Sequence, residues 1–255
     1  MSIKPYSESV KCYFRNNSKR ESKHSSTKVE VYFADKKSLY SWFSYLKNYV
    51  TEDEQLIANS FNSDTYRKTY LSCHALLRLI LAAKLNMEPS DLSIIKGSNN
   101  KPVLSSNQAY FNLSHTRDAF AFAVSRDFHV GIDLEKVRQS INIHPILEKF
   151  FSTKEQEYIL ETATKTFNRF FLLWTRKEAL LKALGTGIIN NLNQIIVSEP
   201  INLLKKELFN NIVDDSFLIE YFIYSYKIKN NFLCVALPIK SSISFYNLNE
   251  ENFIC

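Results

Sequence analysis

Val130-Gly131-Ile132-Asp133-Leu134-Glu135 and, further along the chain, Trp174-Thr175-Arg176-Lys177-Glu178-Ala179-Leu180-Leu181-Lys182-Ala183 are the two most informative segments of this sequence. The first alternates apolar and acidic residues, as a strand does, so Asp133 and Glu135 point to the same side. The second has apolar residues at helical spacing, and Glu178 and Lys182 share one helix face because they are four residues apart. The two segments together indicate a mixed α and β fold.

Strands and helices are predicted in both halves of the chain. Strands are predicted at residues 28–34, 109–113, 119–125 and 129–135, with helices at 39–50 and 64–87. The last three of these strands have short connections, which favours a meander. Later helices are predicted to begin at the Ser152–Glu155 capping box and to run over residues 166–184 as far as Gly185. Strands at 194–199, 217–227, 232–238 and 242–248 complete an α+β order.

Composition excludes several classes of protein. The net charge is +6, but residues 1–27 hold six Lys or Arg against two Glu, so most of this charge lies in a basic tail. We expect this tail to be disordered, and we expect neither a nucleic-acid-binding face nor a secretory signal. Four separated cysteines without a CxxC pair argue against structural zinc and favour a reducing, cytoplasmic location. No apolar run is long enough to predict a membrane span.

The two acids of the first segment suit a metal ion. Mg²⁺ prefers oxygen ligands and commonly combines carboxylates with phosphate oxygens and water. Asp133 and Glu135 on one side of a strand meet that need, but two solvent-facing acids would have the same spacing. Gly131 allows either a close approach of backbone or ligand, or a bulge in the strand.

Glu178 and its neighbouring lysines are open to two interpretations. An acid among apolar helix neighbours and next to a lysine suits a metal and phosphate site. The same spacing gives an ordinary (i, i+4) pair with Lys182, worth about 0.2–0.5 kcal/mol. Lys177 and Lys182 would neutralise phosphate oxygens in the first interpretation and be simply solvated in the second.

Phe111-Asn112-Leu113-Ser114-His115-Thr116 is a third candidate segment. Ser114 and His115 do not form a Ser-His-Asp triad, because adjacent side chains diverge. His115 would instead donate to a phosphate oxygen, unless the pair marks only a turn. Lys101-Pro102 precedes this segment, and the proline stiffens a loop that carries a lysine.

The order of these motifs resembles the 4′-phosphopantetheinyl transferase superfamily of the surfactin-synthetase-activator (Sfp) type, over roughly residues 60 to 190. The resemblance implies a pseudo-dimer of two similar α+β subdomains with the active site in the cleft between them. It implies a Mg²⁺-dependent enzyme that transfers the 4′-phosphopantetheine group of coenzyme A to a serine of an apo acyl or peptidyl carrier protein and releases adenosine 3′,5′-bisphosphate. We place the two subdomains at residues 28–138 and 139–255.

The resemblance also implies residue roles. Asp133, Glu135 and Glu178 would bind the metal, and Glu135, Glu178 and Lys182 would form the catalytic set. Lys101, Pro102, Ser114, His115 and Lys182 would bind coenzyme A. Glu155 falls near a family glutamate proposed to assist deprotonation, although its place in a capping box explains it equally well.

One family feature is missing from this chain. Family members often bind the 3′-phosphate of coenzyme A with an arginine and preceding lysines, which here align with Thr69, Glu54 and Ile57. Arg67 and Lys68 lie close by and are candidate substitutes. The general base, the role of the tail and the carrier protein stay open.

Two other functions compete with the transferase. A degenerate homologue would hold carrier domains or nucleotide without catalysis, and the missing 3′-phosphate residues favour it. A different Mg²⁺-dependent phosphotransferase or nucleotide hydrolase is the other, although the chain lacks a P-loop pattern. We expect a monomer that binds no nucleic acid and no membrane. An acidic carrier would be attracted by a positive surface near Lys136, Arg138, Arg176 and Lys177, unless these are ordinary solvated charges.

Overall fold

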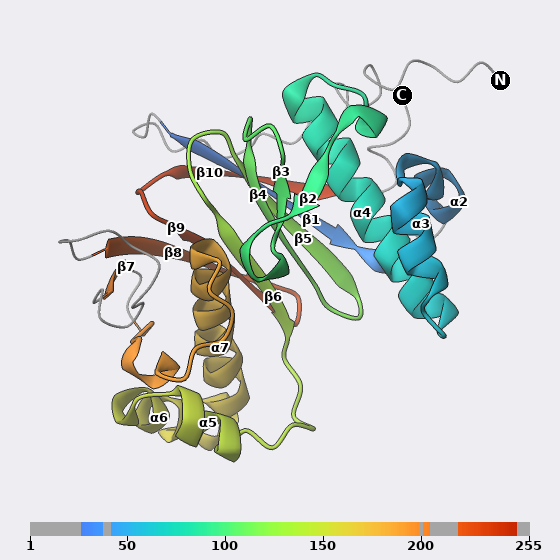
Figure 1. Ribbon diagram of the computed structural model, residues 1–255. Coiled ribbons are helices and arrows are strands. Elements are labelled where there is room, and N and C mark those ends of the chain that lie inside the picture. The colour runs from blue at the N-terminus through green and yellow to red at the C-terminus, as the bar shows by residue number, and fades with distance from the viewer. Residues whose placement is uncertain (1–26, 38–41, 199–200, 205–218, 249–255) are drawn as a thin grey trace.

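The structure is a computed structural model that describes residues 27–37, 42–198, 201–204 and 219–248 (Figure 1). It is an α+β protein with two four-stranded sheets, a two-stranded sheet and two long helices. The predicted basic tail, apart from Thr27, lies outside the described residues. No described helix has both the length and the hydropathy that a membrane span requires.

The first sheet has the strand order β10-β1-β5-β4. Its members are β1 (Lys28–Asp35), β4 (Tyr110–His115), β5 (Ala119–Ser125) and β10 (Ser242–Leu248). α4 (Asp64–Leu85) covers one face of this sheet, and its buried residues share a core cluster with side chains of β1, β4 and β5 (Figure 1). α4 ends at Asn86, whose left-handed conformation (φ 57°) terminates the helix.

The second sheet has the order β6-β9-β8-β7. Its members are β6 (Gly131–Lys136), β7 (Ile201–Leu204), β8 (Ile219–Ile228) and β9 (Asn231–Leu237). α7 (Thr166–Leu184) packs against it and ends at Gly185, as the sequence predicted. Gly185 has φ 71°, a conformation that glycine adopts without the steric cost of a side chain.

The two halves have similar connectivity. In each, a first strand leads through helices to a long helix, and an antiparallel hairpin follows, after β2 and β3 in the first half and after β7 in the second. The first strand pairs with the second strand of that hairpin: β1 with β5 in one half and β6 with β9 in the other. The inward faces of β1, β5, β6 and β9 share a third core cluster, so the two sheets pack together.

The last strand crosses between the halves. β10 pairs in parallel with β1, so residues 242–248 extend the first sheet although they follow the second in sequence. The division of the chain at residues 138 and 139 stays a prediction, and residues 242–248 tie the two halves to one another.

One prediction of strand pairing and one prediction of a strand were wrong. Residues 109–135 do not form a meander, because β6 pairs with β9 and not with β5. Side chains of β4 reach β6 instead: Asn112 Oδ1 accepts from the Ile132 N–H at 2.9 Å and Ser114 Oγ from the Leu134 N–H at 3.2 Å. Residues 194–198 are not a strand, since the carbonyls of Leu192 and Ile195 accept hydrogen bonds from Lys177 Nζ.

Shorter elements complete the described fold. They are α2 (Phe43–Leu46), η2 (Lys47–Tyr49), α3 (Glu52–Asn59), η3 (Pro89–Asp91), β2 (Ile94–Lys96), η4 (Ser98–Asn100), β3 (Pro102–Leu104), α5 (His144–Phe150), α6 (Thr153–Leu160), η5 (Ala163–Lys165) and η6 (Leu192–Gln194). The Ser152–Glu155 capping box is confirmed at the start of α6. A second capping box, Thr51–Glu54, starts α3. Neither this box nor the helix was predicted from the sequence.

Glu54 makes the stability of the N-terminal half sensitive to acid. Burial opposes ionisation of Glu54, but hydrogen bonds from His74, Arg78 and the Thr51 N–H lower its pKa to about 2. A carboxylate with a lowered pKa stabilises the fold above the unfolded-state value of 4.5, and this contribution is lost as the pH falls from there toward 2. The shift corresponds to about 3 kcal/mol.

We therefore expect Glu54→Gln to lower the free energy of unfolding by about 3 kcal/mol at pH 7 and by much less at pH 2.5. Urea unfolding at the two pH values measures this difference. Glu52→Gln, on the exposed first turn of the same helix, is the matched control and should change little. An equal effect of Glu54→Gln at both pH values would contradict the linkage.

Candidate active site

The candidate site lies where β6 meets α7. Gly131 makes this meeting close, because a Cβ on it would stand 2.0 Å from Ala179 O and 2.3 Å from Ala183 N. The helix backbone therefore lies directly on the strand. This contact places Asp133 of β6 beside the helix face that carries Lys182.

Asp133 is the centre of a buried polar group. Its Oδ1 accepts from Lys182 Nζ at 2.7 Å and from Ser114 Oγ at 2.9 Å, and Lys182 Nζ also lies 3.1 Å from Ser114 Oγ. Its other oxygen, Oδ2, is buried and has no hydrogen-bond partner in the described part of the chain. A buried carboxylate oxygen without a partner is costly, so Asp133 Oδ2 is a candidate ligand atom for a cation.

Glu178 and Glu135 lie within electrostatic reach of Asp133. Burial and then the charge of Asp133 raise the pKa of Glu178 to about 7, against the opposing effect of Lys182. The pKa of Glu135 is raised by burial and by Asp133, while Arg138, Lys182 and a hydrogen bond from Trp174 act in the opposite direction. The three acids that the sequence singled out therefore lie within electrostatic reach of one another.

The donor chemistry of this site fits a hard divalent cation. The three acids offer only oxygen ligands, as Mg²⁺ requires, and the unpartnered Asp133 Oδ2 is a vacant donor. Within the described ranges, no three His, Cys, Asp or Glu side chains are already grouped as ligands. The Lys182 ammonium instead pairs with Asp133 at 2.7 Å.

The other candidate coenzyme residues separate into two groups. Ser114 is buried between β4 and β6, with its hydroxyl bonded to Asp133, Lys182 and the Leu134 N–H, whereas His115 ends β4 at the surface. Desolvation, Lys36 and Lys182 lower the pKa of His115. Lys101 lies outside this group, because its ammonium donates to the carbonyls of Val130 and Lys182. Pro102 begins β3, where it pairs with Lys96.

Lys177 and Glu155 are not at the site surface. Lys177 is fully buried and pairs with Glu155 at 3.0 Å, while Glu155 Oε1 accepts from the Val197 N–H at 2.9 Å. Lys177 therefore cannot contact phosphate or a carrier, and the expectation that it does was wrong. Arg176 is also engaged, with bonds to Ser225 Oγ and to the carbonyls of Val197 and Ser198.

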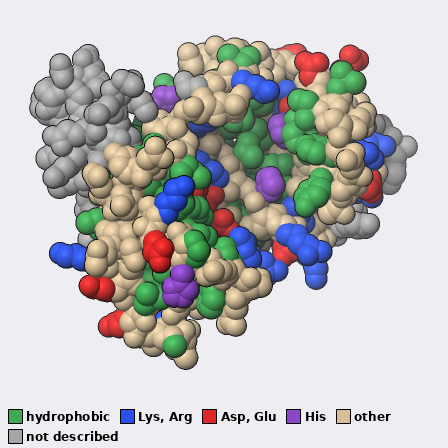
Figure 2. Space-filling model, turned by 60° about the horizontal axis from the view of Figure 1, so that its bottom comes forward, with side chains coloured by type: hydrophobic (Ala, Val, Ile, Leu, Met, Phe, Trp, Pro, Cys, Tyr) green, Lys and Arg blue, Asp and Glu red, His purple; other side chains and the backbone are tan. Residues whose placement is uncertain are grey.

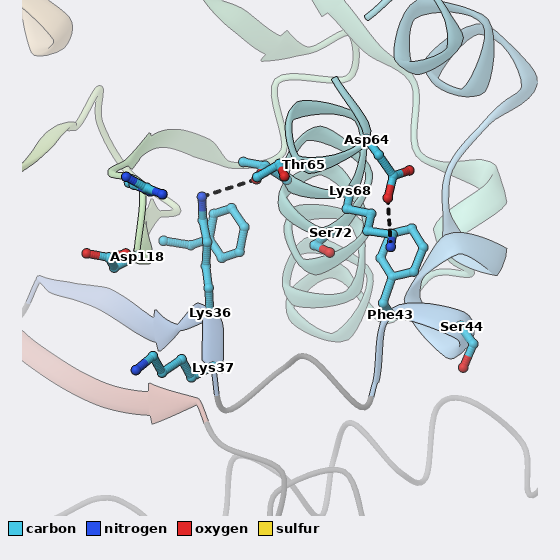
Figure 3. A pocket seen from close by; sticks show the side chains of 12 residues that line it. Lys36, Lys37, Phe43, Ser44, Asp64, Thr65, Lys68, Ser72 and Asp118 are labelled. Carbon is cyan, nitrogen blue, oxygen red and sulfur yellow. Dashed lines mark hydrogen bonds and ion pairs between the residues drawn. The ribbon is translucent and has the colours of Figure 1, made fainter. Parts of the chain in front are cut away.

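A basic cavity of about 550 Å³ lies in the first half of the chain (Figure 3). Its lining residues are Lys36, Lys37, Phe43, Ser44, Asp64, Thr65, Lys68, Thr69, Ser72, Arg117, Asp118 and Phe120. The two acids are already paired, Asp64 with Lys68 at 2.8 Å and Asp118 with Lys136. The cavity is therefore left with positive charge, a feature that local sequence spacing did not reveal.

Lys36 is the cation best placed inside this cavity. It points from the end of β1 toward α4, donates to Thr69 Oγ1 at 3.3 Å and lies 4.7 Å from the centre of the Phe120 ring (Figure 3). Burial lowers its pKa, and no carboxylate of the described residues forms an ion pair with it. A half-buried ammonium that lacks an anion is a ready partner for one.

Figure 2 shows that the face turned forward there is hollowed, with a histidine and acidic and basic side chains in and around the hollow. Of the residues that align with the family's 3′-phosphate contacts, only Thr69 lines the basic cavity. Glu54 is buried and bonded to Arg78, and Ile57 is exposed on α3. The aligned positions therefore do not form an anion site, whereas Lys36 and Lys68 line the basic cavity.

Comparison with known proteins gives matches within a single family. A model of the 4′-phosphopantetheinyl transferase superfamily matches residues 129–227, which include β6 and α7. The 4′-phosphopantetheinyl transferase gsp of Aneurinibacillus migulanus is 30% identical over 184 residues, 66% of this chain and 75% of that protein. The transferase psf-1 of Bacillus pumilus is 31% identical over 162 residues, 63% of this chain and 68% of psf-1.

A third relative is matched over a smaller share of its length. The transferase HetI of Nostoc sp. (strain PCC 7120) is 33% identical over 144 residues, which are 54% of this chain and 61% of HetI. The match thus spans less than two thirds of that relative.

Proposed function

This chain belongs to the 4′-phosphopantetheinyl transferase superfamily, and we propose that it transfers the 4′-phosphopantetheine group of coenzyme A to a serine of an apo carrier protein. The observation that carries this proposal is the meeting of Asp133, Glu178 and Lys182 at the β6–α7 contact, with one Asp133 oxygen buried and unpartnered. The two halves with similar connectivity support a pseudo-dimer with this site between them.

Asp133, Glu135 and Glu178 are the residues we assign to Mg²⁺. The ion, when bound, would neutralise the diphosphate of coenzyme A and polarise the phosphorus under attack. Glu135 and Glu178 ionise more fully beside a cation, because a positive charge opposes the burial that raises their pKa values.

Lys182 and the carboxylates act on the reacting groups. The serine hydroxyl of the carrier attacks the β-phosphorus, the phosphoanhydride bond breaks, and adenosine 3′,5′-bisphosphate leaves. The Lys182 ammonium stabilises the charge that develops on the leaving group, and a carboxylate of the site accepts the serine proton. The nucleophile belongs to the carrier, so the chain needs to supply only position and charge.

The basic cavity accommodates the nucleotide end of coenzyme A. Burial and the charges of Lys36 and Lys182 lower the pKa of His115, so His115 lies within electrostatic reach of both the cavity and the Asp133 group. Lys36 and Lys68 would bind the 3′-phosphate, with Arg117 at the cavity wall. These residues replace the family contacts that this chain lacks.

Lys36→Met is therefore expected to raise the KM for coenzyme A about tenfold, the effect of losing one charge-assisted hydrogen bond. The KM for dephospho-coenzyme A, which has no 3′-phosphate, should change less than twofold. Steady-state kinetics with both substrates tests this, with Lys47→Met on an exposed part of η2 as control. Equal changes in KM with both substrates would show that this cavity does not bind the 3′-phosphate.

The carrier is expected to be acidic. Lys136 and Arg138 are both about half exposed and lie at the end of β6, next to Glu135. Lys136 pairs with Asp118 and Arg138 with Glu135 at 3.5 Å, and the exposed part of each would contact an acidic carrier. We assign the enzyme to the cytoplasm as a monomer that uses neither nucleic acid nor membrane, with reduced thiols such as the free Cys73 and Cys234.

Mass spectrometry tests the proposed transfer. The protein is incubated with coenzyme A, Mg²⁺ and several apo carriers, and a carrier that serves as substrate gains the mass of one phosphopantetheine arm. The gain should disappear with EDTA and return with excess Mg²⁺. If no carrier gains mass, the chain is a binding module or has another activity, and ATP turnover without carrier would identify a nucleotide hydrolase.

A further inference from the structure

The turn between β2 and β3 reaches from the first half of the chain to the end of α7. The turn is closed by a hydrogen bond from the Gly97 N–H to Lys101 O at 2.8 Å, and Asn99 and Asn100 are left-handed, with φ 51° and 59°. Asn99 Nδ2 donates to Gly185 O at 2.7 Å, directly after the helix. The turn is thus attached to the C-terminus of the helix that carries Glu178 and Lys182.

Lys101 makes the stronger of these attachments. Its ammonium donates to Lys182 O at 2.5 Å and to Val130 O at 3.3 Å. Lys182 O lies in the last turn, where the helical ladder ends: the N–H groups of Gly185 and Thr186 both go to Leu181 O. Lys101 therefore satisfies a carbonyl that has no helical donor, at the helix end where a cation is favoured.

The two carbonyls belong to the two sides of the active site. One is the backbone of Lys182, whose own ammonium is 2.7 Å from Asp133 Oδ1. The other is Val130, directly before Gly131 and three residues before Asp133. One ammonium thus connects the backbone of the catalytic lysine with the start of the strand that carries Asp133.

The surroundings of Lys101 do not suit a coenzyme ligand. No carboxylate of the described residues pairs with it, and burial and the charge of Lys182 lower its pKa to about 8. The cavity that it lines together with Tyr110 and His129 has a volume of about 30 Å³. This is room for about one water molecule and not for a phosphate group or a purine ring.

We propose that Lys101 is a positioning residue that holds the last turn of α7 against the start of β6, so that Lys182 stays directed at Asp133, and that its ammonium does not bind coenzyme A. The expected effect on kcat rests on the proposed function. It reassigns a residue that the family resemblance places at the adenine pocket.

Lys101→Met tests this role in the full chain, because methionine keeps the stem and removes the ammonium. We expect kcat for transfer to fall about tenfold or more, while the KM and the calorimetric Kd for coenzyme A stay within twofold of the wild type. Lys101→Arg, which keeps charge and donors, should recover part of kcat. Lys96→Met, at an exposed position of the same hairpin, is the matched control and should leave both values unchanged.

Amide hydrogen exchange gives a second measurement that needs no carrier. In Lys101→Met the amides of residues 183–186 should exchange faster than in the wild type, while those in the middle of α7 do not change. If the wild type modifies no carrier, the transferase proposal fails, and the exchange and Kd measurements still decide the role of Lys101.

Two results would overturn the positioning role. A higher KM and Kd for coenzyme A with unchanged kcat would make Lys101 a coenzyme ligand, and unchanged kcat and exchange would mean that the contact has no effect. If Lys101→Met does not fold, Asn99→Gly replaces it, since glycine keeps the left-handed turn and removes only the bond to Gly185 O. It should speed exchange at residues 183–186 and lower kcat, and no change in either would also reject the proposal.

Discussion

Replacing Asp133 with asparagine is expected to lower the transfer rate by about 10²–10³-fold, the usual cost of losing one preorganised charge contact in an active site. The change keeps the size of the side chain but removes the charge that pairs with Lys182 and that we propose binds the metal. The new amide would also present an N–H group where one of the two carboxylate oxygens now stands. The rate is measured as mass gain of the carrier at saturating coenzyme A and Mg²⁺.

Measurements of folding distinguish this result from a general loss of structure. Asp133→Asn removes a repulsive charge next to Glu135 and Glu178, so the pKa of Glu178 should fall and the protein should stay folded. Thermal unfolding and circular dichroism measure this, and Asp127→Asn, exposed in the turn before β6, is the control. A variant with near-wild-type rate would show that Asp133 does not bind the metal.

Replacing Gly131 with alanine is expected to have the largest effect on the fold. The new Cβ would lie 2.0 Å from Ala179 O and 2.9 Å from Ala183 Cα, and both are backbone atoms that no rotamer change can move. Overpacking against side chains usually costs about 1–3 kcal/mol, and overlap with backbone costs more. We therefore expect a loss of more than about 3 kcal/mol, or no folded protein.

Gly187→Ala is the matched control for this substitution. Gly187 is also a glycine near α7, but a Cβ on it meets nothing within 4 Å. Its positive φ of 67° predicts a cost of about 1 kcal/mol from backbone strain alone. Urea unfolding compares the two variants, and a wild-type midpoint for Gly131→Ala would mean that α7 does not lie directly on β6.

Several features of this chain follow from interactions between residues that are close in sequence. The spacing of apolar residues and Gly185 predicted the bounds of α7, and Ser152 with Glu155 predicted the start of α6. Alternation placed Asp133 and Glu135 on one side of a strand. The motif order predicted a family membership that the comparisons confirm, whereas the roles of the individual site residues stay proposals.

Other features depend on contacts between distant residues. Lys177 and Lys182 both look like solvated helix lysines in sequence, but one is fully buried on Glu155 and the other faces Asp133. Lys36 contacts Thr69 at the basic cavity, although no motif in the sequence singles out Lys36. Lys101 donates to two backbone carbonyls. Since every residue has a backbone carbonyl, the sequence does not show which ones a lysine contacts.

The sequence alone therefore determined the local elements of this protein and the chemical identity of its acids, because helix caps, helical periodicity and strand alternation act over a few residues. The tertiary structure decided which strand β6 joins, which lysine is buried and which ammonium meets which oxygen. Side chains of β4 accept hydrogen bonds from N–H groups of β6, and Gly131, which has no side chain, allows α7 to pack directly on that strand. Such contacts depend on packing between distant segments, and burial then sets the charge of the groups that they bring together.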